Sequence, residues 1–333
     1  MGRGLCLSEC LFNFLSIYTF MPVSVTTMQA ARNMFQSSME QVAQQAASRL
    51  RSYATVTTGC TGKSQAHRKI LPAEMQDSTG RLQPTVGQEL LLSQRYLFPR
   101  KASLTTYLDE DDALDIDMQV APTGEIGEQH RSAAGRKIDD ILIAGILGTN
   151  LEGLEDNMTS VALPASQFIA VNYRRDGGTA NTGLTLAKLI RAKGKFGKAE
   201  VHGQEQKQAG AKVCMAVSQD ELDNLLYDVE QTGSADYNKI RSLVDGEVDY
   251  FMGIQFLRTE RLPQTVPSGG KITRTCPMWV STGVHLDFWY DVTTKISERN
   301  DLSDALQIRS KIKVGACRKQ EEYVVGVYCE QDA

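Results

Sequence analysis

The chain has 333 residues, of which 41% are hydrophobic and 23% are charged, the composition of an ordinary globular protein. Its length allows about two domains. The net charge of −4 and the isoelectric point near 5.7 argue against a protein whose main task is to grip nucleic-acid phosphates.

Cysteine and histidine form no pattern typical of a metal site or a disulfide framework. The 7 cysteines include no C-x-x-C pair and no paired Cys/His spacing, and this usage fits a reducing compartment best. The 4 histidines are isolated, and for His130 and His285 packing is a better explanation than catalysis. No nucleophile has a plausible base beside it. We therefore predict no catalysis and no bound metal or cofactor.

Residues 1–27 differ in character from the rest of the chain. Arg3 precedes an apolar run that polar residues interrupt, so the run is too short and too polar to span a membrane. A basic start and an apolar middle suit a signal peptide, but no small-x-small cleavage site precedes Thr27. The segment is therefore either a signal peptide or an upstream extension or flexible arm, and it stays unassigned.

Residues 28–53 show an apolar stripe at helical spacing, with polar residues over the rest of the surface. The stripe consists of Phe35, Met39, Val42, Ala46 and Tyr53. Such a helix is marginal alone, so it must lie on another surface. It is either a surface helix of its own domain or an arm that contacts a neighbouring subunit through Phe35 and Met39.

Residues 63–106 have no helical period. Segments 67–71 and 88–98 have strand character, and residues 77–80 between them are a turn signal. A lone two-stranded ribbon is marginal in water, so this loop must also lie on another surface, most simply on a neighbouring copy. The candidates for ion pairs across that contact are Arg95, Arg100 and Lys101. The alternative is that all three are solvated surface charges.

An acidic cluster lies within residues 106–120. It consists of Asp109, Glu110, Asp111, Asp112, Asp115 and Asp117. Such clusters can bind calcium or magnesium, but the EF-hand pattern with its obligatory Gly and closing Glu is absent. The solvated acidic face of a short helix explains the cluster better than a metal site does.

A long helix is predicted over residues 123–148. Thr123 is a good N-cap, Glu125 suits the positive end of the helix dipole, and Gly148 is a good stop. Apolar residues recur at spacings of three and four, and residues 138–147 are apolar almost all round. We expect the first half of this helix to be half-exposed and its end to be buried in a core.

The rest of the chain alternates between helical and strand-like segments. Strands are predicted over residues 167–173, 211–217, 253–259 and 275–290, and a closing hairpin over 310–315 and 323–329. Helices are predicted over 182–196, after Ser218 and over 289–301, and residues 151–160 are predicted to form a loop. One face of the helix over 182–196 is basic, through Lys188, Arg191, Lys193 and Lys195. This face either meets phosphate or is an ordinary exposed face.

Several segments, in their order along the chain, resemble the major capsid proteins of tailed bacteriophages with the Hong Kong 97-like fold. The matching segments are 44–52 (QQAASRLRS), 135–148 (GRKIDDILIAGILG), 183–193 (GLTLAKLIRAK), 235–262 and 313–329. No single segment is diagnostic, so their collinearity carries the resemblance. Residues 1–27 match nothing in that family.

The resemblance implies an α+β fold in which each predicted element has a place. Residues 28–62 would be the N-terminal arm and 63–106 an extended β-hairpin loop. Residues 107–199 and 306–333 would form the peripheral domain, with 123–148 as its spine helix, and 200–305 an α/β axial domain.

The resemblance also implies a structural protein and no enzyme. Hexamers and pentamers of the chain would build an icosahedral phage head around double-stranded DNA, without sequence-specific binding. Scaffold, portal and decoration proteins are possible partners, no membrane is involved, and the virion would be assembled in the host bacterial cytoplasm. The alternatives are an encapsulin-like compartment shell, an exported envelope protein if residues 1–27 are a signal peptide, and an enzyme with an acidic metal site.

Overall fold

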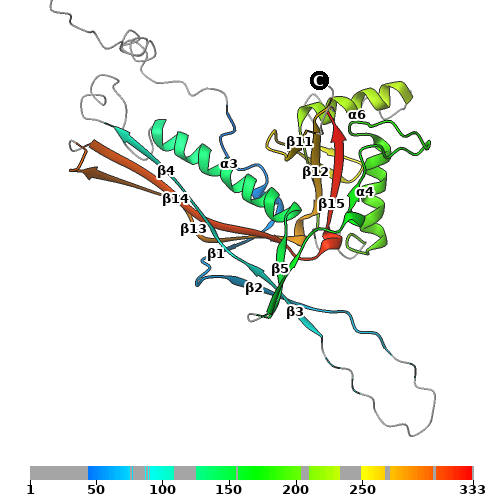
Figure 1. Ribbon diagram of the computed structural model, residues 1–333, viewed down its shortest axis with the longest axis horizontal. Coiled ribbons are helices and arrows are strands. Elements are labelled where there is room, and N and C mark those ends of the chain that lie inside the picture. Colours follow the sequence, from blue (N-terminus) through cyan, green and yellow to red (C-terminus); the bar gives the residue numbers. More distant parts are fainter. Residues whose placement is uncertain are drawn as a thin grey trace, which may run out of the picture.

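The computed structural model describes residues 44–75, 91–108, 125–154, 157–203, 210–232, 249–266, 271–302 and 305–331, with the single residues 77, 87 and 89. This part of the chain contains three α-helices and three β-sheets. Figure 1 shows an elongated sheet with one long helix, a second body that carries the other two helices, and a narrow hairpin. The mixed content confirms the predicted α+β class.

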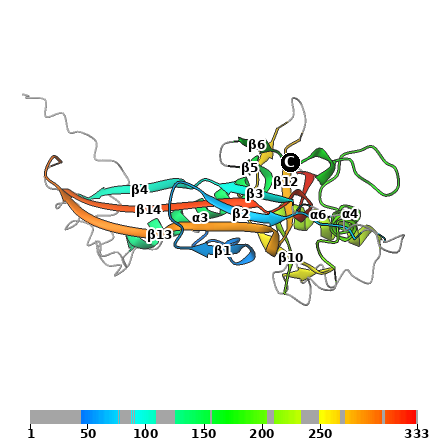
Figure 2. The ribbon, with the colours of Figure 1, turned by 90° about the horizontal axis from the view of Figure 1, so that it is seen from below.

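The first sheet has four strands in the order β1-β13-β14-β4. They are β1 (Thr55–Thr58), β13 (Val284–Arg299), β14 (Ala305–Arg318) and β4 (Arg100–Leu108). The strand β14 runs antiparallel to both β13 and β4, whereas β1 is parallel to β13. The long helix α3 (Glu125–Leu147) lies along one face of this sheet, and Figure 2 shows the three long strands side by side in front of it. The helix predicted over residues 123–148 is thereby confirmed.

The helix α3 is held by an apolar stripe near its C-terminal end. Ile138, Leu142 and Ile146 are buried in one core with Ile312 and Val314 of β14. Burial of such side chains stabilises the pair by about 1.5–3 kcal/mol each. The expected burial of the helix end therefore comes from packing against β14.

Gly145 allows α3 to approach β14 closely. A Cβ atom at this position would lie 2.6 Å from the carbonyl oxygen of Ala316. We expect Gly145→Ala to lower the free energy of unfolding by about 1–3 kcal/mol, because the sheet backbone must move to admit the methyl group. Gly194→Ala is the matched control, since a Cβ there meets nothing within 4 Å. The control should gain about 0.5–1 kcal/mol from helix propensity, and urea unfolding measures both changes.

The second sheet forms the core of the other body. Its path is β7-β15-β12-β8-β10-β9, and β11 pairs with β12. The strands are β7 (Phe168–Ile169), β8 (Val213–Val217), β9 (Tyr250–Phe251), β10 (Ile254–Arg258), β11 (Gln264–Thr265), β12 (Thr273–Val280) and β15 (Val324–Glu330). Every residue of β8 is buried, as the apolar run over 211–217 predicts. The helices α4 (Leu186–Lys198) and α6 (Gln219–Thr232) lie beside this sheet (Figure 1).

The third sheet is the narrow hairpin with two short partners. Its order is β2-β3-β5-β6, with β2 (Gln65–Ile70), β3 (Leu92–Leu97), β5 (Asn150–Leu154) and β6 (Asn157–Val161). The antiparallel pair β2–β3 confirms the two strands predicted in the extended loop. The loop predicted over 151–160 is wrong, because β5 and β6 pair there as a hairpin.

Three further local predictions are wrong. Residues 44–50 of the expected N-terminal helix are not helical, and only a 3-10 turn, η1 (Arg51–Tyr53), follows them; residues 28–43 lie outside the described residues. The helix expected over 289–301 is the second half of β13, because pairing with β14 satisfies its backbone groups. The strand expected over 167–173 is reduced to the two residues of β7.

The chain crosses between the two bodies more often than the sequence predicts. The expected closing hairpin is wrong, because β14 lies in the first sheet and β15 lies between β7 and β12 in the second. The helix α4 packs against β15, although residues 107–199 were expected to form the domain of α3. Conversely, β13 joins the sheet of α3 although it lies within the expected axial segment, 200–305. The loop expected over 63–106 ends earlier, since β4 belongs to the first sheet.

No helix in the described part of the chain is long and apolar enough to cross a membrane.

Candidate subunit interfaces

The β2–β3 hairpin projects from the body of the molecule and carries exposed apolar side chains (Figure 1). Ile70 is 64% exposed, Leu91 59% and Leu92 60%, and Met75 is fully exposed. The ladder continues past the strand ends, since the amide of Leu71 donates to the carbonyl of Leu91 at 3.0 Å. Clustered apolar residues on a projecting element are typical of a protein contact.

Buried ion pairs fix the base of this hairpin. The guanidinium of Arg95 is only 1% exposed, and its Nη2 lies 3.0 Å from carboxylate oxygens of both Glu152 and Glu321. Lys69 lies 2.6 Å from Glu152 as well. Burial would raise the pKa of Glu152, but hydrogen bonds from Lys69 and Ser93 and the charge of Arg95 lower it below its usual value. The position of the hairpin is therefore set within the subunit.

The residues predicted from the sequence to make subunit contacts differ in their surroundings. Arg95 is used inside the subunit, so its predicted ion pair across a subunit contact does not fit its burial. Arg100 and Lys101 are exposed on β4, and their role stays a prediction. Phe35 and Met39 lie outside the described residues, as does the acidic cluster. Among the residues that the structure places, no group of three His, Cys, Asp or Glu could hold a metal ion.

A histidine pair ties β2 to β13 on the other side of the hairpin base. The Nε2 of His67 lies 2.6 Å from the Oδ2 of Asp287, which is fully buried. The ring of His67 also stacks on His285, with 4.0 Å between the ring centroids. Burial, followed by the nearby His67, lowers the pKa of His285 to about 4. Packing explains His285, as the sequence predicts. The sequence did not indicate that His67 would be the residue that stacks on it.

Acid should therefore lower the stability of the folded subunit, through protonation of His285. Its pKa is lowered in the folded state from an ordinary value near 6.5, so the unfolded chain binds the extra proton. The stability that neutral His285 allows is thus complete above pH 6.5 and is lost as the pH falls toward about 4, by about 2 kcal/mol after allowance for solvent screening. Urea unfolding at pH 7 and pH 4.5 measures this loss.

His285→Phe is the control for the acid effect, since it keeps an aromatic ring against His67 but cannot take a proton. The variant should lose less stability than the wild type between the two pH values. An equal loss in both proteins would assign the acid effect to the carboxylates instead.

The described start of the chain is fastened to α3. The carboxylate of Asp139 is fully buried and accepts hydrogen bonds from the hydroxyl of Ser48 and from the backbone amides of Arg49 and Leu50. A buried carboxylate that accepts several hydrogen bonds is costly to replace. The described part of the predicted arm is thus anchored on the helix, at a residue that sequence pattern alone does not single out.

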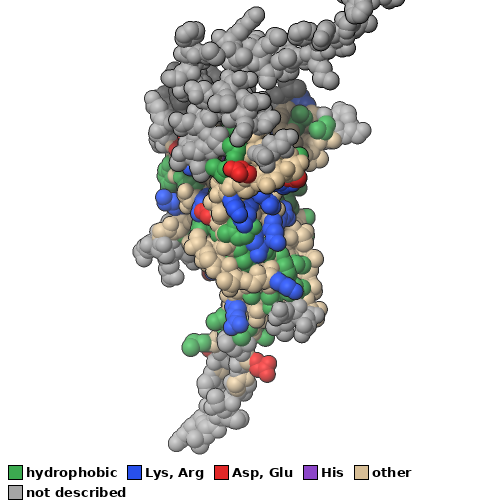
Figure 3. Space-filling view, turned by 90° about the vertical axis from the view of Figure 1, so that its left-hand side faces the viewer, with side chains coloured by type: hydrophobic (Ala, Val, Ile, Leu, Met, Phe, Trp, Pro, Cys, Tyr) green, Lys and Arg blue, Asp and Glu red, His purple; other side chains and the backbone are tan. Residues whose placement is uncertain are grey.

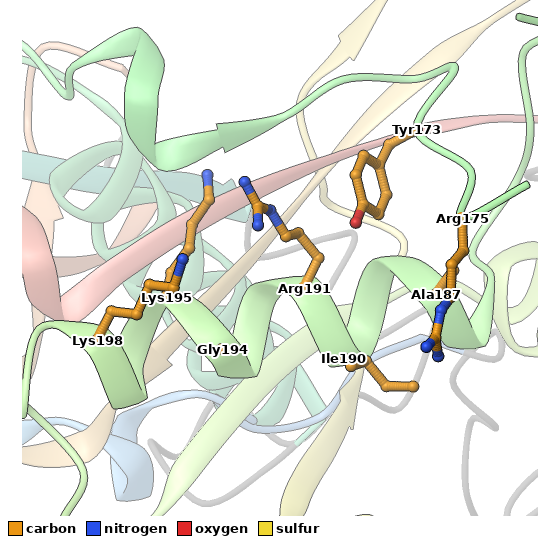
Figure 4. Close-up of a pocket in the computed structure, with 8 residues that line it drawn as sticks. All are labelled: Tyr173, Arg175, Ala187, Ile190, Arg191, Gly194, Lys195 and Lys198. Carbon is orange, nitrogen blue, oxygen red and sulfur yellow. The ribbon is translucent and has the colours of Figure 1, made fainter. Parts of the chain in front are cut away.

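A groove of about 380 Å³ lies along α4 (Figure 4). Arg175, Arg191 and Lys198 line it, and the guanidinium of Arg191 lies 5.9 Å from the ring centre of Tyr173. Lys195 also lines the groove, but its ammonium donates to two backbone carbonyls. An anionic group in the groove would therefore contact only the charges of Arg175, Arg191 and Lys198.

The predicted basic face of this helix is partly wrong. Lys188 is fully buried, and its ammonium donates to the backbone carbonyls of Thr182, Gly183 and Tyr328. Burial lowers the pKa of Lys188. The exposed positions include Ile190 instead, at 47% exposure. The ammonium of Lys188 is therefore bonded inside the subunit and does not contribute to a basic surface on the helix.

Comparison with known protein families gives a match over most of the chain. The family model described as "Phage capsid protein" matches residues 27–331. No curated protein matches the sequence.

Solved structures of phage capsids share the fold. The "Cyanophage Pam1 capsid asymmetric unit" has a TM-score of 0.61 at 10% identity and covers 89% of this chain and 95% of its own. "Mycobacterium phage Che8" has a TM-score of 0.60 at 12% identity, covering 88% and 95%. "Capsid of Ralstonia phage GP4" has a TM-score of 0.60 at 9% identity, covering 90% and 95%. At these identities the likeness concerns the fold, and it confirms the predicted Hong Kong 97-like architecture.

Proposed function

Because the chain belongs to the phage capsid protein family, it is a structural major capsid protein of a phage head, and we propose that it self-assembles into a closed icosahedral shell of hexamers and pentamers. The shell encloses double-stranded DNA without reading its sequence. The net charge of −4 supports this, since a container that gripped phosphate strongly would hinder release of the genome. Assembly takes place in the cytoplasm of the host bacterium, with scaffold, portal and decoration proteins as further partners.

The observation that carries the assembly proposal is the projecting hairpin. Its strands are rigidly placed by Arg95 and Glu152, while Ile70, Leu91 and Leu92 contact no core of their own. A projecting element that exposes apolar side chains, and whose position is set within its own subunit, is suited to contact a neighbouring subunit. We assign it to the contact between adjacent copies, where symmetry repeats a modest gain many times.

The two bodies take the two domain roles of the fold. The sheet with β4, β13 and β14, together with α3, forms the peripheral domain. The sheet with β8, β12 and β15, together with α4 and α6, forms the axial domain. Strand pairing supports this division, whose boundaries differ from those expected from the sequence.

Particle formation tests the function directly. The chain would be expressed with and without residues 1–27, and particle mass would be measured by light scattering beside negative-stain electron microscopy. Closed shells, or hexamer and pentamer rings, are the expected result. A monomer at every concentration, also with the phage's scaffold protein supplied, would overturn the proposal. Shells that package a protein cargo in place of DNA would favour the encapsulin-like alternative.

A further inference from the structure

The first sheet has one covered face and one open face. On β14, Ser310 hydrogen-bonds to His130 of α3, and Ile312 and Val314 share the core with that helix. Because side chains alternate along a strand, Arg309, Lys311 and Lys313 lie on the opposite face. No described helix covers this side, on which the long strands lie in front of α3 in Figure 2.

The open face is strongly basic. Lys101 of β4 lies directly opposite Lys313, and Lys295 of β13 lies directly opposite Arg309. We call Lys101, Lys295, Arg309, Lys311 and Lys313 the basic sheet face. Four of them are exposed and Lys313 is half-buried. Figure 3, which looks at this end of the molecule, shows Lys and Arg side chains gathered over its middle.

These charges have no counter-charge within the described part of the subunit. No carboxylate there forms an ion pair with any member of the basic sheet face. The cross-strand neighbours of Lys311 are Ser103 and Thr293, which are uncharged. Like charges placed directly opposite each other destabilise a sheet. Lys311 and Lys313 lie over the rings of Tyr290 and Trp289, which attract cations but do not neutralise them. Within the part of the chain that the structure describes, the face therefore carries an electrostatic cost that an anionic partner would remove.

We propose that the basic sheet face docks the acidic segment 109–117 of a second copy of this chain. This proposal rests on the proposed function, since it names a contact between subunits of the shell. The segment has six carboxylates and no Lys or Arg, so its charge complements that of the face. Such complementarity sets the register of a contact and speeds association.

The spacing of the charges supports the same pairing. Arg309, Lys311 and Lys313 occupy alternate positions of β14, about 7 Å apart along the strand. In the acidic segment, Asp115 and Asp117 also alternate, with Ile116 between them. The docked form requires residues 115–117 to be extended, in place of the short helix that the sequence pattern favours. In that form the two carboxylates recur at the interval at which β14 presents its cations. The groove on α4 offers no such row, and its Lys195 is already bonded to carbonyls.

A charge swap tests the contact. The first variant carries Arg309→Glu and Lys311→Glu, the second carries Asp115→Lys and Asp117→Lys, and a third carries all four changes. We expect each of the first two to lower the yield of assembled particles by about tenfold or more, and the third to regain most of that yield, because it restores opposite charges at the contact. Circular dichroism and the melting temperature of the unassembled subunit confirm that each variant folds.

Arg131→Glu with Lys212→Glu is the control, since it makes the same change in net charge at exposed positions away from this face. An equal loss in the control, or normal assembly of the first variant, would overturn the inference. Shells of the first variant that form normally but package less DNA would overturn it in favour of a nucleic-acid contact. Failure of the wild-type chain to form particles would instead remove the proposed function.

Discussion

Joining Leu71 to Leu91 through Asn-Gly, in place of residues 72–90, is expected to abolish particle assembly and leave the subunit folded. Leu71 and Leu91 already form a backbone hydrogen bond, and an Asn-Gly turn closes such a ladder. The change removes the projecting part of the hairpin, including the fully exposed Met75. Light scattering should report a soluble monomer, and the melting temperature should stay close to that of the unassembled wild type.

A second variant separates loss of contact from loss of length. Ile70→Ser, Leu91→Ser and Leu92→Ser keep the full hairpin but remove its exposed apolar surface, and they should also lower the particle yield strongly. If the shortened chain assembled normal shells, the hairpin would not be part of the contact between subunits. A deletion of residues 63–106 would not test the same point, because it also removes β4 from the first sheet.

Arg318→Met is expected to lower the free energy of unfolding by about 3–5 kcal/mol. The guanidinium of Arg318 is fully buried, and it donates to the carbonyls of Ile146 and Gly148 at the end of α3 and to that of Val161 at 2.8 Å. Its Nε also lies 3.5 Å from Glu321. Met fills similar space but leaves these acceptors unpaired. Urea unfolding of the unassembled subunit measures the loss.

Arg299→Met is the matched control for Arg318. Arg299 pairs with Asp301 near the turn between β13 and β14, and both side chains are exposed to solvent. Exposed ion pairs contribute little to stability, so the unfolding transition should not move measurably. If Arg318→Met lowered the free energy of unfolding no more than Arg299→Met does, packing alone would hold the end of α3 against β14 and β6.

The residues that connect the first sheet to the third sheet and to the end of α3 are far apart in the sequence. Arg318 bonds to carbonyls more than 150 positions earlier, and the separation of His67 from Asp287 is 220 positions. No local pattern indicates such pairs, because a buried cation or carboxylate obeys no period. The one available signal was chemical: a charged residue among apolar neighbours in a strand, such as Asp287 in VHLDFWY, needs a buried partner.

One local error could have been avoided. Residues 289–301 contain Val292, Thr293, Thr294 and Ile296, and β-branched residues of this kind favour a strand over a helix. The helix predicted there gives way to a strand, because the ladder with β14 decides the conformation.

The sequence by itself determined the long helix, its end in the core, the strands β2, β3, β8 and β10, and the resemblance to phage capsid proteins. Each of these depends on neighbours in the chain, through caps, period and apolar runs. Tertiary structure decided the rest: β14 and β15 enter different sheets, Arg95 turns inward, and Lys188 is buried among carbonyls. These outcomes depend on which distant backbone and charged groups can be satisfied together, and that is settled only when the chain packs.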